Sequence, residues 1–425
     1  MVLFVLYFLF SFASEFPPFL ILPSKRPKPP RDTATMRKSS CYHLLALVLT
    51  YASSNAFILT SKPLVTRLPI QPSISHTEDT SIDDDAINNI PCRILLLDHL
   101  NINHQKGQHD ALKAFYFDFL RCTIDPRKYE NYVAGSKTIW ANVGMHQFHL
   151  PEGKPDAQVL EGVITLVHEN CEGLIERYSK FLDGDDKFAS LQGTEFHVDV
   201  ERDSDNFDDL MLMVTDPWGN EFCILPTDDA ADDRAEFLGS QPNLEDNLKS
   251  EGLKLEDLTI YVSHGSNLEG IARFYQKVFG ATSVEELETN SSISIAIGDR
   301  QMLTFMYHPG GAKVKVQHHD LSFDEVDEYG NPSNFGPHIS MYVTNLSYAY
   351  RMADELNVAY VNPRFKRRAY TEDEAIDQCM FRILDIVDPL DQQKNVIISL
   401  EHEVRSTTTR DGKKYKSCPL INVDL

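Results

Sequence analysis

The sequence predicts an α+β protein in which antiparallel strands alternate with single helices. An internal repeat carries this prediction. The segment LLLDHLNI at 95–102 reappears as LKLEDLTI at 253–260, and apolar and polar residues alternate in both, as in a half-buried strand. An amphipathic helix is expected after each strand, at 111–124 and 268–282. The Phe-Tyr pairs of the two helices match in position, and we interpret them as core residues.

Each copy continues with a pattern typical of a β-hairpin, at 138–150 and at 292–306. Both patterns contain Gly-x-x-Gln, and a glycine between two alternating runs favours a tight turn. Two further strands match in position, at 160–170 and 335–345. A helix follows each of them, at 174–182 and 348–357, and each copy ends in a closing strand with an Asp-Pro turn, at 213–225 and 383–400. Each copy therefore reads as two β-α-β-β units.

The repeat sets the expected domain organisation. We expect a targeting presequence and an acidic linker at 1–90, a first domain at 91–226, a linker at 227–250, and a second domain with a C-terminal tail at 251–425. The stretch between the two domains is acidic and contains Gly and Pro, which is typical of a linker.

Composition limits the classes of function. The chain has 425 residues, of which 42% are hydrophobic, and a formal net charge of -23. This composition supports folded cores, and the negative charge disfavours a nucleic-acid partner. The seven cysteines show neither zinc-ribbon spacing nor a disulfide framework, which favours a reducing compartment.

The N-terminal part has the features of a targeting signal. A basic pair after Met36 precedes a short apolar run, and a processing site is expected at 54–56. The stretch 57–77 is basic, rich in hydroxyl groups and free of acidic residues. This order resembles the bipartite plastid presequences of algae with complex plastids, so we expect a plastid location, with the secretory pathway or an N-terminal membrane anchor as alternatives. No later segment has about 18 consecutive apolar residues, so no membrane partner is expected for the mature protein.

The sequence resembles the vicinal-oxygen-chelate superfamily. The resemblance lies in the strand LDHLNI (97–102), the helix with its Phe-Tyr pair, the turn DPWGNEF (216–222) and the strand GPHISMYV (336–343). It covers about 91–226 and 251–403.

The resemblance implies two tandem domains, each of paired βαβββ modules whose curved sheets enclose a concave site. It also implies a divalent metal (Fe, Mn, Zn or Ni), held by His on the first strand of a module and Glu on the last. Members include glyoxalase I, extradiol dioxygenases, epimerases and antibiotic-sequestering proteins. In the enzymes, the metal binds two neighbouring substrate oxygens and stabilises the anion that forms.

In the first domain the ligand set implied by this resemblance is incomplete. His99 has the expected position on the first strand, and His149 lies on the hairpin, so both are candidate metal ligands. Val163 and Cys223 stand where a second His and the terminal Glu are expected. The alternative is that His99 is a hydrogen-bonded core or pocket histidine.

The second domain is the expected metal site if either domain binds a metal. Asp257, His338 and Glu401 or Glu403 are its candidate ligands, in a facial triad. His402 lies on the opposite face of the last strand, so a slip of one residue would turn the glutamates outward. The alternative is that these last residues are exposed beyond the sheet.

Other polar residues are candidates for binding a ligand. The expected pocket residues are four amides, Asn101, Asn103, Gln147 and Gln301. The insertion at 313–334 contains His318 and His319, and it forms either a surface loop or a lid. The basic segment FKRRAY (365–370) is either a solvated loop or a contact for an anionic substrate.

Three kinds of function follow from the resemblance. The first is a metal-dependent lyase, isomerase or dioxygenase that acts on a small oxygenated substrate. The alternatives are a non-enzymatic protein that binds or sequesters a small molecule, and a scaffold that holds a partner. The chain has no P-loop, no GxGxxG after a strand, no GxSxG and no HExxH, so nucleotide-binding, hydrolase and zinc-protease functions have no support.

Overall fold

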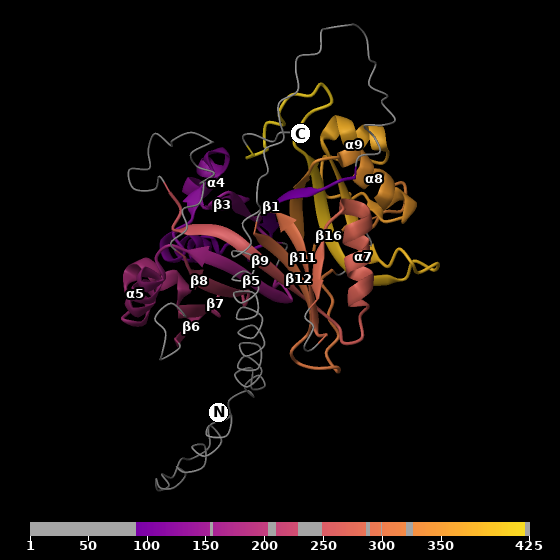
Figure 1. The fold of residues 1–425 in the computed structure, drawn as a ribbon. Coiled ribbons are helices and arrows are strands. Elements are labelled where there is room, and N and C mark those ends of the chain that lie inside the picture. Colours follow the sequence, from indigo (N-terminus) through magenta and orange to yellow (C-terminus); the bar gives the residue numbers. More distant parts are fainter. Residues whose placement is uncertain are drawn as a thin grey trace, which may run out of the picture. The chain divides into compact units, whose positions relative to one another are not determined.

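The computed structural model (Figure 1) describes residues 91–153, 156–202, 210–227, 249–285, 290–298, 300–319 and 326–420. The expected presequence and most of the expected linker at 227–250 lie outside these stretches. No helix in the described stretches is long and apolar enough to cross a bilayer.

The first two of four modules lie between residues 91 and 227, and each contains a strand, a helical segment and three further strands. Module 1 consists of β1 (Ile94–Asn101), α3 (His109–Lys113), η1 (Ala114–Phe119), β2 (Thr123–Ile124), η2 (Pro126–Lys128), α4 (Tyr129–Ala134), β3 (Ile139–Val143) and β4 (His146–Leu150). Module 2 consists of β5 (Gly162–His168), α5 (Cys171–Leu182), η3 (Asp186–Leu191), β6 (His197–Arg202), β7 (Leu210–Thr215) and β8 (Glu221–Pro226).

The other two modules follow the same order of elements. Module 3 consists of β9 (Gly252–Val262), α7 (Leu268–Phe279), β10 (Ser283–Glu285), β11 (Ser292–Gly298) and β12 (Gln301–Tyr307). Module 4 consists of β13 (His338–Val343), α8 (Leu346–Glu355), β14 (Ala359–Tyr360), α9 (Glu372–Gln378), β15 (Met380–Val387) and β16 (Val396–Ser406). The expected α+β class with βαβββ modules is confirmed.

Each of two eight-stranded sheets is built from two modules. The first sheet has the strand order β14-β15-β16-β13-β1-β4-β3-β2, and the second has the order β10-β11-β12-β9-β5-β8-β7-β6. Modules 1 and 4 therefore share the first sheet through the antiparallel pair β1 and β13. Modules 2 and 3 share the second sheet through the antiparallel pair β5 and β9. The modules of one sheet thus come from different copies of the expected repeat, and neither copy has a sheet of its own.

Three of the modules begin their helix with the same capping residue. The side chains of Asn170, Asn267 and Asn345 each accept a hydrogen bond from the backbone N–H three residues further on. In modules 2 and 3 that third residue is a glycine, and a Cβ atom on Gly173 or Gly270 would lie within 3 Å of the asparagine side chain. The cap and the glycine therefore fix where the helix begins after the first strand.

The helix expected at 111–124 differs from its counterpart in module 3. It changes after Lys113 into the π-helical segment η1, in which Leu120 N–H donates to the carbonyl of Phe115. Phe115 and Tyr116 are nevertheless fully buried, as are the matching Phe274 and Tyr275. The interpretation of these aromatic pairs as core residues is correct.

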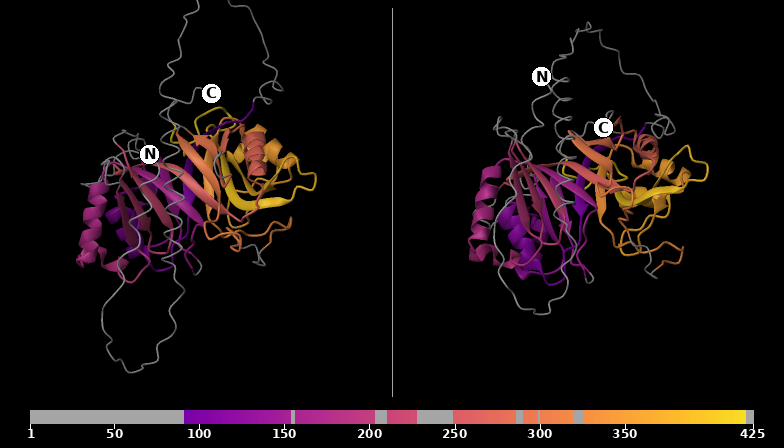
Figure 2. Two further views of the ribbon diagram at one scale, coloured as in Figure 1. Left: turned by 60° about the horizontal axis from the view of Figure 1, so that its bottom comes forward. Right: turned by 90° about the horizontal axis from the view of Figure 1, so that it is seen from below.

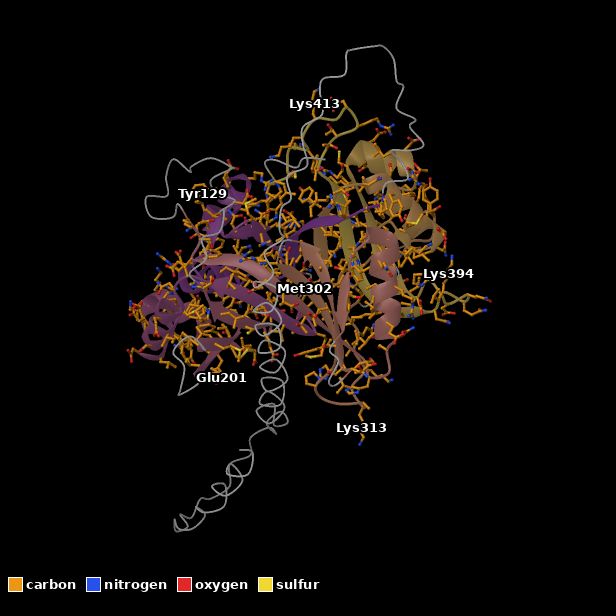
Figure 3. The ribbon with its side chains drawn as sticks, viewed as in Figure 1. Tyr129, Glu201, Met302, Lys313, Lys394 and Lys413 are labelled. Atoms are coloured by element: carbon orange, nitrogen blue, oxygen red, sulfur yellow. The ribbon has the colours of Figure 1, made fainter. Side chains whose placement is uncertain are left out.

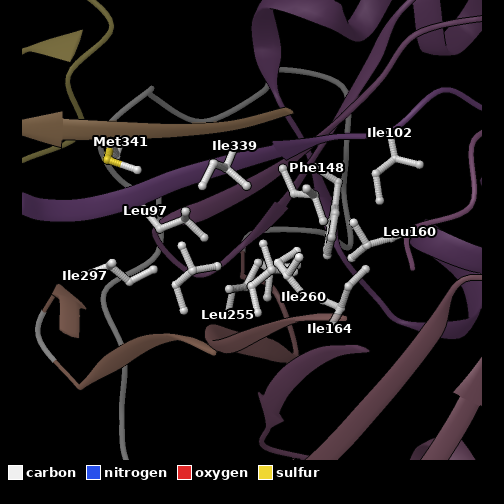
Figure 4. Packing of buried hydrophobic residues seen from close by; sticks show 14 of the residues in the cluster. Leu97, Ile102, Phe148, Leu160, Ile164, Leu255, Ile260, Ile297, Ile339 and Met341 are labelled. Carbon is white, nitrogen blue, oxygen red and sulfur yellow. The ribbon is translucent and has the colours of Figure 1, made fainter. Parts of the chain in front are cut away.

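The hydrophobic core lies between the two sheets. Figure 4 shows Leu97 and Ile339 of the first sheet facing Leu255 and Ile260 of the second, and all four are buried in one cluster. Helix α7 packs against α8, β11 and β15, so it contacts strands of both sheets (Figure 2). The two sheets are therefore parts of one packed body, and the opposite face of the first sheet is left to carry polar groups.

An ion pair connects module 3 to module 4. Asp388, in the turn after β15, accepts hydrogen bonds from Arg273 Nε at 2.9 Å, Arg273 Nη2 at 2.7 Å and Asn267 Nδ2 at 2.9 Å. These bonds to Arg273, above all, lower the pKa of Asp388 from 3.8 to about 2. Because the pKa is lowered in the folded state, the stabilisation is complete above about pH 4 and is lost as the pH falls towards 2.

We therefore expect Asp388→Asn to lower the free energy of unfolding at pH 7 by about 1–2 kcal/mol. The difference from wild type should shrink between about pH 4 and pH 2, as measured by urea unfolding followed by fluorescence. Asp411→Asn is the control, since Asp411 is exposed and pairs with the exposed Lys413. A difference that is the same at pH 2 and pH 7 would contradict this role of the ion pair.

Candidate metal centre and pocket

Three possible metal ligands meet on the face of the first sheet that is turned away from the core. His99 lies on β1, His338 is the first residue of β13, and Glu403 lies on β16. One ligand atom from each lies within 4.8 Å of the others, and all three side chains are buried. Among the described residues this is the only such group of three or more His, Cys, Asp or Glu side chains. We call these three residues the triad.

Strand register explains why the triad forms. Ser340 of β13 lies opposite His99 of β1 and also opposite Glu403 of β16. Cross-strand neighbours share a face of a sheet, and so do residues two apart on one strand, which places His338 on the same face as Ser340. The small Ser340 side chain leaves room for the larger side chains on either side.

His99 is oriented by its neighbour in the sequence. Its Nδ1 atom is 2.8 Å from Oδ2 of Asp98, which assigns the ring proton to Nδ1. Its Nε2 atom is buried and has no hydrogen-bond partner among the described groups. Burial lowers the pKa of His99, against the opposing effect of the Asp98 hydrogen bond. The ring is therefore neutral, with a free lone pair on Nε2, and a carboxylate behind a histidine is the usual support of a metal ligand.

The surroundings of the other two triad residues also determine their charge states. Burial, together with the positive charge of Arg382, lowers the pKa of His338 well below its usual value, so its ring is neutral. Burial alone would raise the pKa of Glu403, but Arg405 and Arg382 hold that pKa well below its usual value. Nε2 of His338 lies 3.9 Å from Oε2 of Glu403. Two neutral imidazoles thus face one ionised carboxylate.

A buried network of charges surrounds Glu403. Arg382 donates to Oε2 of Glu403 and also binds Glu401, while Arg405 donates to Oε1 of Glu403. Arg405 Nη1 also lies 3.5 Å from Oδ2 of Asp98. The three carboxylates and two guanidinium groups of this network have a formal charge of minus one, so a cation at the triad would not enter a positive environment.

The donor set fits a divalent metal. The unpartnered Nε2 of His99 is a buried polar atom that needs a partner, and a metal would supply one. Both oxygens of Glu403 accept hydrogen bonds from arginines, but each carboxylate oxygen has a second lone pair available for coordination. His99, His338 and Glu403 would hold the metal and leave other positions open to a substrate.

Stacked rings extend from the triad along the same face. The ring of His149 lies 3.6 Å from that of His99, and the ring of Trp140 lies 4.2 Å from that of His149, measured between centroids. The guanidinium of Arg127 is 4.7 Å from the centre of the Trp140 ring. His149, an expected ligand, is therefore placed as a stacking partner, with its Nε2 atom 3.2 Å from Oε1 of Gln147.

A pocket of about 250 Å³ adjoins the triad. It is lined by residues of modules 1 and 4 and of the C-terminal tail, namely Arg127, Trp140, Gln147, His149, Phe365, Lys366, Arg367, Met380, Arg382, Glu403, Arg405, Tyr415 and Ser417. The basic segment at 365–370 thus contributes to the pocket wall.

The expected second-domain metal site is wrong in one ligand. Asp257 lies on β9 of the second sheet, where it accepts hydrogen bonds from Thr259 at 2.7 Å and Thr304 at 2.6 Å. Glu401 is near the triad, but its carboxylate is bound by Arg382, Asn334 and Asn362. The reason for the error is the pairing of modules: β9 pairs with β5, and β13 pairs with β1.

The four expected pocket amides have different surroundings. Gln147 lines the pocket and donates to Asp125 and Asn142 at 2.6 Å each. Asn101 lies opposite His338. The backbone N–H of Asn103 donates to Gln158 outside the pocket. Gln301 was expected in a pocket but instead connects the sheets, because its side chain accepts from Leu97 N–H and donates to the carbonyl of Leu255.

The second sheet repeats the strand register that forms the triad, but it lacks the three triad side chains. Thr165 of β5 lies opposite both Asp257 of β9 and Cys223 of β8, which is the register of Ser340, His99 and Glu403 in the first sheet. Val163 takes the place of His338. Each copy of the repeat therefore supplied an incomplete ligand set because the complete set is divided between them.

Asp98, Arg382, Arg405 and Trp140 were not among the sequence candidates, although they complete the site. Arg405 follows Glu403 by two residues on the same face of its strand, so it was within reach of a pattern argument. Asp98 directly precedes His99, and strand alternation would place it on the opposite face; β1 has a register shift between Leu97 and His99, which no sequence pattern indicated. Arg382 lies opposite Glu403 only through the pairing of β15 with β16.

No family model matches the chain, and no curated protein matches it. A glyoxalase I variant from Zea mays is similar over 74% of this chain and 92% of its own, with 11% identity and a TM-score of 0.39. The 2,3-dioxygenase LapB from Pseudomonas sp. KL28 is similar over 74% and 92%, with 12% identity and a TM-score of 0.24. The cppA protein from Streptococcus pneumoniae is similar over 74% and 99%, with 12% identity and a TM-score of 0.36.

The buried charge network makes a prediction about stability. Arg382→Met leaves Glu401 and Glu403 without their shared cation, so we expect the free energy of unfolding to fall by about 3–5 kcal/mol. Arg351→Met is the matched control, since Arg351 pairs with Glu372 where both side chains are about one-third exposed. The control should lose less than about 1 kcal/mol. Urea unfolding measures both, and equal losses would contradict a specific role of Arg382 in the network.

Proposed function

We propose that the triad binds a divalent metal, that the adjoining pocket binds a small oxygenated substrate, and that the protein is a metal-dependent lyase, isomerase or dioxygenase. The observation that carries this proposal is the convergence of His99, His338 and Glu403 with an unpartnered nitrogen on His99. Two imidazoles and one carboxylate with open positions are typical of non-haem Fe(II) enzymes, so iron is the first metal to test, before Mn, Zn and Ni.

The chain's own groups prepare the site for such a reaction. A divalent metal, when bound, supplies Lewis-acid activation of a substrate oxygen. Asp98 keeps the proton of His99 on Nδ1 and so directs the free lone pair into the site. Arg382 and Arg405 keep Glu403 ionised, so that its carboxylate can serve as an anionic ligand.

Non-enzymatic binding of a small molecule is the second candidate function. It is favoured by one observation, namely that both oxygens of Glu403 already accept hydrogen bonds from Arg382 and Arg405. A pocket that is electrostatically satisfied in this way can bind a ligand without a metal. Metal content therefore separates the two candidates.

We expect the full chain, loaded with Fe(II) without oxygen, to retain about one metal per chain, as one triad predicts. His99→Ala and His338→Ala should abolish retention, because two protein ligands rarely hold a metal. Asp98→Asn should weaken metal affinity by about 10–100-fold, because Asp98 orients His99 but is not itself a ligand. Elemental analysis and metal titration measure these effects.

Asp257→Asn is the control for the metal experiment, since Asp257 is an acidic residue on the matching strand of the other sheet. It should keep the metal content of the wild type. Metal that survives His99→Ala, or is lost in Asp257→Asn, would overturn the assignment. No retained metal in the wild type would favour the binding protein.

A further inference from the structure

Cationic side chains outnumber carboxylates in the lining of the pocket beside the triad, although the chain as a whole has a formal charge of -23. The lining cations are contributed by both halves of the chain, and Glu403 is the only carboxylate among the described residues of the lining. These cations are Arg127, Lys366, Arg367, Arg382 and Arg405. A concentration of positive charge at a concave site in an acidic protein selects the sign of charge of what enters.

Three of these cations already have carboxylate partners. Arg127 pairs with Asp125 at 2.6 Å, while Arg382 and Arg405 bind Glu403. They are therefore fixed in place, and much of their charge is neutralised. These pairs make the wall of the pocket rigid rather than free to bind an anion.

The other two cations, Lys366 and Arg367, have no ion-pair partner in the part of the chain that the structure describes. Both belong to the loop between β14 and α9, and both side chains are exposed to solvent at the pocket. Arg367 Nη1 donates to the hydroxyl of Tyr415, a residue of the C-terminal tail that is itself buried. Arg367 is thus positioned without being neutralised, which is the condition that favours binding a free anion.

Flat rings line the same pocket. Trp140 lies parallel to His149, with 11° between the ring planes, and Phe365 packs on the guanidinium of Arg382 at 3.9 Å. The Trp140 ring already packs against His149, Arg127 and Lys128, and the His149 ring packs against His99 and Trp140. These rings therefore contribute apolar edges to the pocket wall rather than free faces. The volume of about 250 Å³ is below the range of about 300–1,000 Å³ that is usual for drug-sized ligands.

We propose that the pocket takes a small molecule that carries an anionic group, with Lys366 and Arg367 binding the anion and the edges of the aromatic side chains packing against its apolar body. A carboxylate and a phosphate ester share this chemistry. The inference deepens the proposed function, since it names the class of substrate whose other end would face the triad.

The test uses three probes of similar shape on the full chain after treatment with EDTA, so that no probe binds through a metal. Benzoate and phenyl phosphate carry an anionic group, and benzamide is the neutral match. We expect at least one anion to bind about tenfold or more tightly than benzamide by calorimetry, because hydrogen bonds to charged groups are worth about that factor. This preference should weaken as the salt concentration rises.

The double variant Lys366→Gln, Arg367→Gln should remove the preference for the anion and leave benzamide binding unchanged. The matched control is Lys313→Gln, Lys315→Gln, which removes the same charge from an exposed loop (Figure 3 labels Lys313) and should keep the preference. Arg367→Lys keeps the positive charge and should retain most of the preference for the anion. It therefore distinguishes loss of charge from a folding defect in the double variant. Thermal unfolding of each variant shows that it is folded.

Equal affinity for anions and benzamide, or an unchanged preference in the double variant, would overturn the inference. The outcome is separable from that of the proposed function. A chain that retains Fe(II) but does not prefer anions contradicts only this inference. A chain that prefers anions but retains no metal contradicts only the metal-dependent function.

Discussion

The antiparallel pairing of β1 with β13 is the constraint on which the site depends. It sets Ser340 opposite His99, and the parallel pairing of β13 with β16 sets the same serine opposite Glu403. Residues far apart in the chain are thereby brought onto one face of one sheet. A shift of one residue in either pairing would turn one ligand into the core, so a change in register would remove the site and not merely distort it.

The same register places charged residues where burial is costly, and the structure compensates them in pairs. Glu403 and Glu401 share Arg382, while Arg405 connects Glu403 to Asp98. If one partner is removed, the other charge stays buried without compensation, and its desolvation cost is no longer offset. We infer that stability and function are coupled here, because the groups that hold Glu403 ionised also bound the pocket.

The sequence predicted the modules, but not which two modules pair within one sheet. Alternation in β1 and β9 and the Phe-Tyr helices are local patterns, and local patterns survive into the structure. The face of β16 was also predicted correctly, since His402 points away from Glu403 and hydrogen-bonds Tyr275 in the core. The pairing of one module with another is a long-range property with no local signal. Asp257 was therefore grouped with His338, although its strand pairs within the other sheet, and Gln301 was placed in a pocket although it connects the two sheets.

The most direct test of this account is anomalous diffraction from crystals of the protein soaked with Mn(II) or loaded with Fe(II). The account predicts one strong anomalous peak in contact with His99, His338 and Glu403, hence with residues from both copies of the repeat. A peak at Asp257 on the second sheet, or at any site that lacks His99, would contradict the claim that the metal centre is assembled between modules 1 and 4.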